Sequence, residues 1–232
     1  MSYTTVLLDL DHTLFDTDAS EEAAFGQALV ASGIDDPWPH FETYRRINRA
    51  LWKQVEQATL TPDQVKTERF RQLGAELQLD ADPMAMAERF TVGLGANGDL
   101  YPGARKALDD LAAGTSLALI TNGLSAVQRA RIERLDLGHY FDAVIISAEV
   151  GVAKPGSAIF DLTFDALRTL AGAPPLKDGS VMVGDSLTSD IKGGRDYGLA
   201  TCWYNPMGAV SGANQITHEI NDLADLATTL LG

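Results

Sequence analysis

Four short apolar runs, each of which stops abruptly at polar residues, constrain the fold of this 232-residue chain more than any other feature. The runs are VLLDLD at 6–11, LALITN at 117–122, AVIISAE at 143–149 and VMVGDS at 181–186, and a fifth, ATCWY, follows at 200–204. Runs this short and unbroken are typical of strands that are buried on both faces, as in a parallel sheet covered by helices. The sequence therefore predicts a parallel sheet that contains these five strands.

Helical patterns separate the apolar runs. They cover residues 103–113, 124–137, 156–171, 188–198 and 219–231. Strands that alternate with helices along a chain favour an α/β fold with a doubly wound, Rossmann-like parallel sheet. We therefore expect helices on both faces of the sheet.

The stretch 17–98 breaks this alternation because it contains no β-branched run. Two pairs within it, Thr61 with Pro62 and Asp82 with Pro83, are typical helix starts. We expect an all-helical insertion, or cap, at 17–98, and an α/β core formed by 1–16 and 99–232. A hinge at each crossing between core and cap would let the cap open and close.

Composition limits the partners of the chain. The 32 acidic residues outnumber the 18 basic ones and leave a formal charge of −14, so neither nucleic acid nor an anionic membrane surface is expected to bind. No apolar run approaches the roughly 20 residues of a membrane helix. The first basic residue is Arg45, which speaks against a secretory signal, and the single cysteine, Cys202, excludes an intramolecular disulfide. We expect a cytoplasmic protein, either a monomer or a homodimer, that acts on a small molecule.

Polar residues that follow the predicted strands indicate where the chemistry lies. Ligands bind beyond the carboxyl ends of the strands in open α/β sheets, and the residues expected to meet there are Asp9, Asp11, Thr121, Asn122, Lys154, Asp185 and Asp190. Each taken alone is more often a turn, a loop or a helix cap. Their joint placement at four strand ends in one chain favours a functional site.

Asp9 and Asp11 would repel each other where the first strand ends, and a divalent cation relieves such repulsion. Mg²⁺ prefers oxygen ligands, few protein carboxylates and the oxygens of a phosphate. Asp9, Asp185 and a backbone carbonyl meet that preference. Lys154 would supply a fixed positive charge and Thr121 a hydroxyl to a bound phosphate.

Four ordered segments resemble the motifs of the haloacid dehalogenase superfamily. They are DLDHTL at 9–14, ITNG at 120–123, GVAKP at 151–155 and GDSLTSDIKGG at 184–194. The helical insertion likewise resembles the C1 cap of that superfamily. The resemblance implies that Asp9 is the nucleophile and Asp11 the general acid and base, and that Thr121, Asn122 and Lys154 bind phosphate.

The same resemblance implies that Mg²⁺, replaceable by Mn²⁺, is bound by Asp9, Asp185 and the main-chain carbonyl of Asp11. Asp190 and Ser186 are expected to lie around the ion without binding it directly. Dehalogenase members lack an acid two residues after the nucleophile, whereas phosphatase members have one, because an alkoxide leaving group needs a proton and a halide does not. Asp11 therefore favours phosphoester hydrolysis through an aspartyl-phosphate.

A narrower resemblance links the chain to the YjjG-like pyrimidine 5′-nucleotidase family. It is carried by LDHTLFD, RINRALW, RLDLGHYFDAVIISAEVGVAKP, IFD and the stretch from MVGDSLTSDIKGG through GLATCWYNP. His12 and Gly156 depart from the Asn and Asp expected at those positions. The resemblance implies release of phosphate from UMP, dUMP, dTMP and modified pyrimidine nucleotides, with Arg46, Asn48 and Trp52 as candidate base contacts in the cap.

Two other interpretations stay open at this stage, and a third is discounted. The substrate could be a phosphosugar or another small organic phosphate. The chain could be a non-catalytic module that only binds phosphate, although a binder does not need Asp11. A receiver-type phosphoacceptor domain also combines Asp, Thr and Lys, but its acceptor Asp follows a later strand and it has no helical insertion.

Overall fold

The computed structural model describes residues 2–171, 175–212 and 216–232, and its centre is a parallel sheet of six strands in the order β3-β2-β1-β4-β5-β6. The strands are β1 (Thr5–Leu8), β2 (Ser116–Thr121), β3 (Ala143–Ile146), β4 (Ser180–Gly184), β5 (Ala200–Tyr204) and β6 (His218–Ile220). The first five coincide with the predicted apolar runs. The predicted fold class, a doubly wound parallel sheet, is confirmed.

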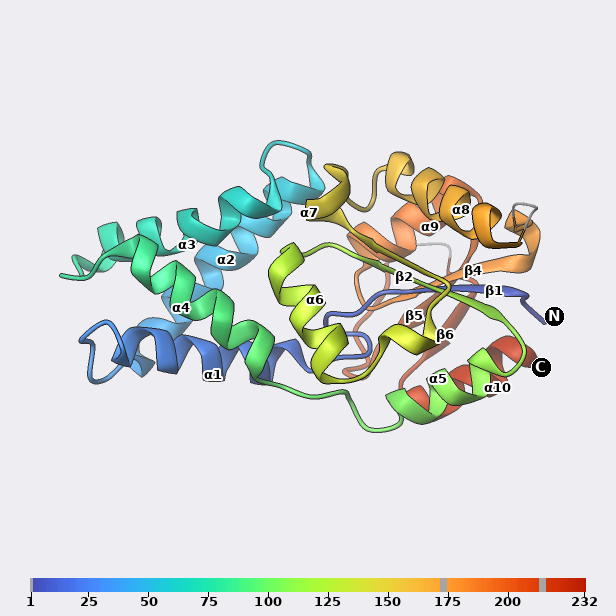
Figure 1. Cartoon of the computed structure of the whole chain (residues 1–232), viewed down its shortest axis with the longest axis horizontal. Helices are drawn as coiled ribbons and strands as arrows, with labels where there is room; N and C mark the ends of the chain where they lie inside the picture. The colour runs from blue at the N-terminus through green and yellow to red at the C-terminus, as the bar shows by residue number, and fades with distance from the viewer. Residues whose placement is uncertain (1, 172–174, 213–215) are drawn as a thin grey trace.

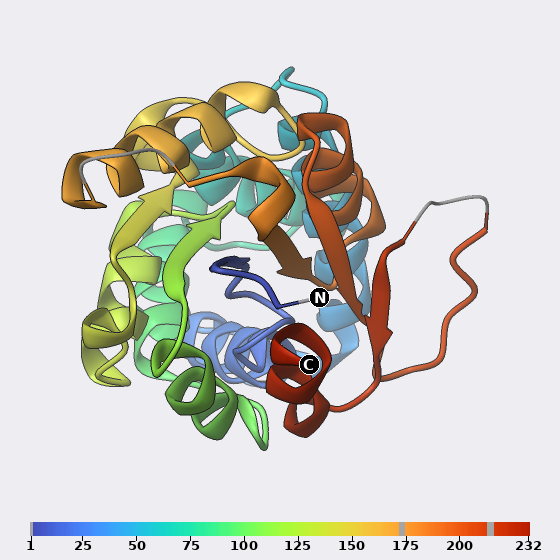
Figure 2. The same ribbon diagram turned by 90° about the vertical axis from the view of Figure 1, so that its right-hand side faces the viewer.

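Successive side chains of β1 point to opposite faces of the sheet, as strand geometry requires. Val6 and Leu8 pack with α5 (Ala104–Ala112) and α10 (Leu226–Leu231). Leu7 packs instead with α8 (Ser157–Ala171), and α9 (Lys192–Tyr197) lies against α8 on the same face. Figures 1 and 2 show these two helical layers on either side of the sheet. Because both faces are covered, β1 is fully buried, which explains its unbroken apolar run.

The predicted helix at 219–231 is wrong in its first half. Residues 218–220 form β6, which pairs with β5, a 3₁₀ turn covers Leu223–Asp225, and only Leu226–Leu231 is α-helical. The cause is tertiary, since the open edge of β5 offers backbone hydrogen bonds that a three-residue segment can accept. The patterns at 124–137 and 188–198 are also shorter in the structure. The first becomes α6 (Ser125–Arg134), and the second divides into a π-helical turn (Leu187–Ile191) and α9.

Four of the helices that follow β1, which together span residues 17–96, form the unit at the left of Figure 1. They are α1 (Thr17–Val30), α2 (Phe41–Glu56), α3 (Pro62–Leu77) and α4 (Pro83–Ala96). Thr61 and Asp82 cap α3 and α4 through their side chains, as the Thr-Pro and Asp-Pro pairs predict. This unit has an apolar core of its own, in which the Tyr44 ring packs against those of Phe70 and Phe90. The division of the chain at residues 17 and 98 stays a prediction.

The two segments that join the sheet to the helical unit run side by side. Phe15 and Leu100 form an antiparallel bridge. The Asp16 amide donates to the Asp99 carbonyl at 2.9 Å, and the Tyr101 amide donates to the Leu14 carbonyl at 2.8 Å. The chain therefore enters and leaves the helical unit at one place.

Among the described residues, no helix combines the length and apolar character that crossing a membrane would require.

Gly98, beside this double crossing, provides a test of the packing. It has φ +83°, and a Cβ there would lie 2.6 Å from the Phe15 ring, whereas Gly33 has φ +86° with nothing within 4 Å. Gly33→Ala should cost about 1–2 kcal/mol for the left-handed conformation alone. Gly98→Ala should cost about 1–3 kcal/mol more, because the added methyl group overpacks the crossing. Urea unfolding measures both losses, and equal losses would contradict the packing described here.

Candidate active site

Asp9 lies directly after β1, at the carboxyl edge of the sheet and in its centre. Its amide continues the sheet by donating to the Val183 carbonyl at 3.0 Å, and the residue as a whole is only 6% exposed. The Lys154 ammonium donates to Asp9 Oδ1 at 2.6 Å, and the Thr13 hydroxyl lies 3.4 Å from Oδ2. Burial raises the pKa of Asp9 well above its usual value, although Lys154 acts in the opposite direction. A buried carboxylate is therefore held in one orientation at this edge.

Lys154 connects two carboxylates. Its Nζ is 2.6 Å from Asp9 Oδ1 and 2.7 Å from Asp190 Oδ1, and the side chain is 1% exposed. Burial alone would lower the pKa of Lys154, but Asp190 and Asp9 outweigh it and raise the pKa. Asn122 fixes the Lys154 backbone, since its amide nitrogen donates to the Lys154 carbonyl and its oxygen accepts from the Lys154 amide, both at 2.9 Å. The Asn122 side chain thus aligns the lysine loop with the end of β2.

Three carboxylates from two strand ends meet in one place. One oxygen each of Asp9, Asp185 and Asp190 lies within 4.8 Å of the other two. Burial and the neighbouring Asp190 raise the pKa of Asp185 to about 6. In the described part of the chain, Lys154 is the one cation that pairs with this cluster. The three ionised carboxylates and Lys154 together therefore carry a formal charge of −2. Buried oxygen ligands that carry an excess of negative charge fit a divalent cation such as Mg²⁺.

Thr13, in the segment after β1, and Ser186, in the loop after β4, hold Asp185 and Asp190 in place. The Thr13 hydroxyl donates to Asp185 Oδ1 at 3.2 Å and accepts from the Asp185 amide at 3.0 Å. The Ser186 amide donates to Asp190 Oδ2 at 3.1 Å, and the Ser186 hydroxyl accepts from the Ser189 amide at 3.2 Å. Ser186 therefore orients Asp190 through its main chain and caps the following turn through its side chain.

The side chain of Asp11 turns away from this cluster toward α6. Its carboxylate accepts hydrogen bonds from Thr17 at 2.7 Å, from Gln128 and from Arg131. Burial alone would raise the pKa of Asp11, but Arg131 and these hydrogen bonds outweigh it and lower the pKa. Gln128 also donates to the Thr121 hydroxyl at 3.1 Å. Asp11 and Thr121 therefore share one amide donor.

His12, between the two aspartates, has φ +60°, in the left-handed region. Asn is favoured over His in that conformation, because its short side chain hydrogen bonds locally. The departure of His12 from the expected Asn thus concerns backbone conformation. The imidazole also acts to lower the pKa of both Asp11 and Asp185.

The three candidate base contacts in the helical unit differ in their surroundings. Asn48 is 8% exposed and donates to Glu21 Oε1 at 2.6 Å. Arg46 pairs with Glu76 on the surface, and Trp52 is partly buried against the apolar core of the unit. These arrangements leave all three as predictions.

Three contributors to the site escape prediction from the sequence: Thr13, Gln128 and Arg131. Glu21, which is partly exposed, lies in the helical unit, where one of its carboxylate oxygens accepts hydrogen bonds from Tyr44 and Asn48. Gln128 and Arg131 are nearly fully buried on α6, more than a hundred residues from Asp11 along the chain. Nothing in the local pattern of α6 distinguishes them, because their partners are set only when the helix packs. Thr13 lies within the first motif and could have been found from its position alone.

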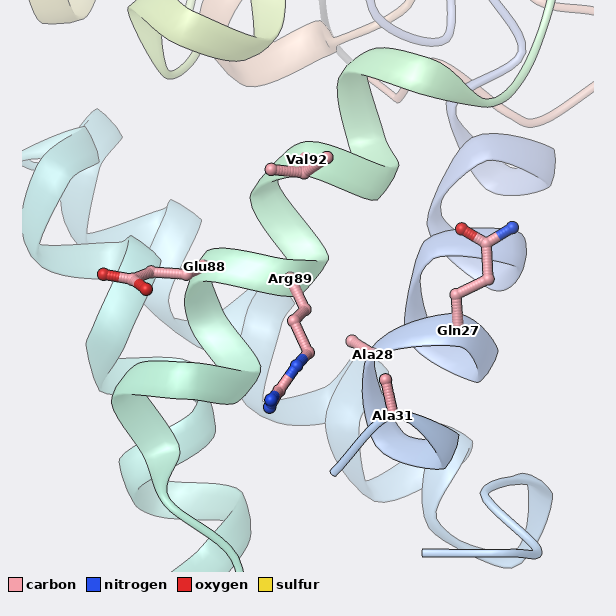
Figure 3. Close-up of a pocket in the computed structure, with 6 residues that line it drawn as sticks. All are labelled: Gln27, Ala28, Ala31, Glu88, Arg89 and Val92. Carbon is pink, nitrogen blue, oxygen red and sulfur yellow. The ribbon is translucent and has the colours of Figure 1, made fainter. Parts of the chain in front are cut away.

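A separate hollow of about 360 Å³ lies between α1 and α4 on the outside of the helical unit (Figure 3). It is lined by Gln27, Ala28, Ala31, Glu88, Arg89 and Val92. None of these residues belongs to the carboxyl edge of the sheet. The hollow is therefore distinct from the carboxylate site.

Comparison with known proteins places this fold and site in a family. The model for haloacid dehalogenase-like hydrolases matches residues 3–198. The chain belongs to this family of hydrolases, as its four motifs predict.

Individual relatives narrow the comparison. The pyrimidine 5′-nucleotidase PynA of Streptococcus pneumoniae is 33% identical over 232 residues, covering 99% of this chain and 96% of its own. The pyrimidine 5′-nucleotidase YjjG of Escherichia coli is 35% identical over 207 residues, covering 88% and 87%. The crystal structure of the HAD-hydrolase YfnB of Bacillus subtilis bound to magnesium superposes with a TM-score of 0.90 at 30% identity, covering 99% of each chain.

The raised pKa of Asp185 makes stability depend on pH. Between its ordinary value of 3.8 and about 6, the folded protein binds a proton that the unfolded chain has released, so stability falls as the pH rises. Asp185→Asn removes this loss. In EDTA, its free energy of unfolding relative to wild type should increase by about 1 kcal/mol between roughly pH 5 and pH 8. Urea unfolding at both pH values tests this, with Asp35→Asn at an exposed carboxylate as control. A difference that stays constant with pH would contradict the expectation.

Proposed function

We propose that this hydrolase is a magnesium-dependent phosphatase that acts on pyrimidine nucleoside 5′-monophosphates. UMP, dUMP, dTMP and modified pyrimidine nucleotides are the expected substrates. The observation that carries the phosphatase part is the pair of Asp9, bound to Lys154 at the centre of the sheet edge, and Asp11, two residues later. The pyrimidine part is supported by the similarity to PynA and YjjG over most of the chain.

Asp9 is the proposed nucleophile. A carboxylate oxygen of Asp9 attacks phosphorus in line with the departing ester oxygen, which forms an aspartyl-phosphate and breaks the bond to the nucleoside. The 2.6 Å contact with Lys154 supports this role, because it holds the carboxylate in one orientation. Lys154, Thr121 and Asn122 would line the phosphate position, with the lysine charge opposing that of the phosphate.

Asp11 is the proposed general acid and base. It would give a proton to the leaving ester oxygen and later accept one from the water that hydrolyses the aspartyl-phosphate. Its position beside Thr121, through the shared Gln128 amide, supports this role. A module that only bound phosphate would need no such group.

Asp9, Asp185 and the main-chain carbonyl of Asp11 would hold the magnesium ion, with Asp190 and Ser186 orienting the surrounding groups. When bound, the ion would neutralise the charge of the phosphate and the repulsion among these carboxylates. The clustering of Asp9, Asp185 and Asp190 supports a cation there, and so does the magnesium-bound relative YfnB. Mn²⁺ has similar ligand preferences and is expected to substitute.

The helical unit would determine which nucleotide fits. A pyrimidine ring is smaller than a purine ring, so a cap that closes over the site could exclude purines sterically. Asn48 is the best placed of the three candidate contacts. It donates to the partly exposed Glu21, which follows Ser20 in the chain. The Ser20 hydroxyl accepts a hydrogen bond from Arg131, which also binds Asp11. Arg46 and Trp52 are weaker candidates, given the surface ion pair of one and the core packing of the other.

Removal of either aspartate tests the proposed chemistry. Asp9→Asn should abolish turnover, because an amide does not attack phosphorus. It should leave the fold intact, because Lys154 remains paired with Asp190. Asp11→Asn should reduce kcat roughly 10²-fold or more, the usual size of general acid–base catalysis. Steady-state phosphate release measures both rates, and circular dichroism checks the fold. A near-wild-type rate for either variant would remove that residue from the mechanism.

A phosphate-release screen tests the substrate class. With Mg²⁺ or Mn²⁺ present, UMP, dUMP and dTMP should give higher kcat/KM than purine monophosphates and hexose phosphates, and EDTA should abolish release. If hexose phosphates were hydrolysed best, the nucleotidase part would be wrong and the phosphatase part would stand. Phosphate binding without any release would instead indicate a non-catalytic module.

A further inference from the structure

The carboxylate of Asp11 has nearly all of its acceptor positions filled by protein donors. An ionised carboxylate offers about four lone-pair sites, two on each oxygen. Oδ1 accepts from the Thr17 hydroxyl and from Arg131 Nη1, and Oδ2 accepts from Gln128 Nε2. One site on Oδ2 is therefore left without a protein donor among the described residues. This oxygen lies next to Thr121, because the same Gln128 nitrogen also donates to the Thr121 hydroxyl.

Arg131, which fills one of these positions, is itself held by the helical unit. Its side chain is 2% exposed, and its guanidinium lies over the Phe15 ring at 4.2 Å from the centroid. Nε donates to the Leu94 carbonyl at 3.0 Å, and Nη2 donates to the Ser20 hydroxyl at 3.2 Å. Leu94 and Ser20 belong to α4 and α1, whereas Arg131 comes from α6. A planar, rigid guanidinium thus connects Asp11 to two helices of the cap.

We propose that Arg131 is a positioning residue that orients the Asp11 carboxylate so that Oδ2 can accept a proton from the attacking water. The inference rests on the proposed function, in which Asp11 acts on the aspartyl-phosphate of Asp9. In that step, the water oxygen forms a bond to phosphorus while the bond between phosphorus and the Asp9 oxygen breaks. The water proton passes to Asp11 Oδ2, the Asp9 carboxylate is restored, and inorganic phosphate leaves.

The proposal predicts that Arg131 affects the second half of the reaction more than the first. The substrate p-nitrophenyl phosphate separates the halves, because its leaving group is a stable anion that departs without a proton. In a rapid-mixing experiment with Mg²⁺, Arg131→Met should release about one p-nitrophenolate per active site at close to the wild-type rate. Steady turnover should then be slower than wild type by roughly tenfold or more, within the range of general base catalysis. Arg131→Lys, which keeps the charge, should show the same burst with a smaller slowing.

Arg134 provides a matched control on the same helix. It donates to the Gly95, Asn97 and Gly98 carbonyls and so also ties α6 to the end of α4, but it makes no contact with Asp11. Arg134→Met should therefore change the first and second halves alike and produce no burst. Circular dichroism establishes that each variant is folded, and Arg131→Lys carries the test if Arg131→Met is not.

The outcomes separate the inference from the proposed function. A folded Arg131 variant that turned over at the wild-type rate with no burst would overturn the positioning role. So would a folded variant in which release of the first p-nitrophenolate was slowed as much as steady turnover. Asp11→Asn should show the same burst as Arg131→Met. If Asp11→Asn turned over normally, the assignment of Asp11 as the base would fall. If Asp11→Asn showed the burst and the Arg131 variants did not, only the role of Arg131 would be wrong.

Discussion

The contact between Asp9 and Lys154 is the interaction on which the site depends. Two opposite charges are buried at the centre of the sheet edge, where the cost of removing them from water is large unless they stay paired. Asp190, at 2.7 Å from the Lys154 ammonium, gives the buried lysine a second carboxylate partner. The parallel sheet makes the pairing possible, because β1 lies between β2 and β4 and brings Asp9 within reach of the loops that follow β3 and β4.

The surroundings of that pair carry more negative charge than Lys154 can balance. Asp185 and Asp190 crowd the same space, and the pKa of Asp185 rises accordingly. Hydrogen bonds from Thr13, Trp203 and the Ser186 amide hold these groups where they repel one another. Stability is thereby lowered locally in favour of a geometry that suits a cation and a phosphate, as is usual where binding and catalysis are arranged.

The sequence predicted the sheet well because its strands are buried on both faces and so appear as apolar runs. It missed β6, whose three residues include His218 and Glu219 and which exists only because β5 offers an edge. The motif residues were placed at the correct strand ends, since topology alone brings the ends of parallel strands together. Gln128 and Arg131 could not be anticipated, because their contacts with Asp11 depend on how α6 packs against the helical unit.

The paired crossing at Phe15 and Leu100 has a consequence for how such a chain can change over time. Because the polypeptide departs and returns through adjacent hydrogen-bonded segments, the core meets the helical unit much as it would meet a hairpin loop. Lengthening, shortening or replacing the excursion leaves the order and register of the strands untouched, and loop closure penalises added length only weakly. The sheet with its carboxylate site and the helical unit can therefore diversify at separate rates.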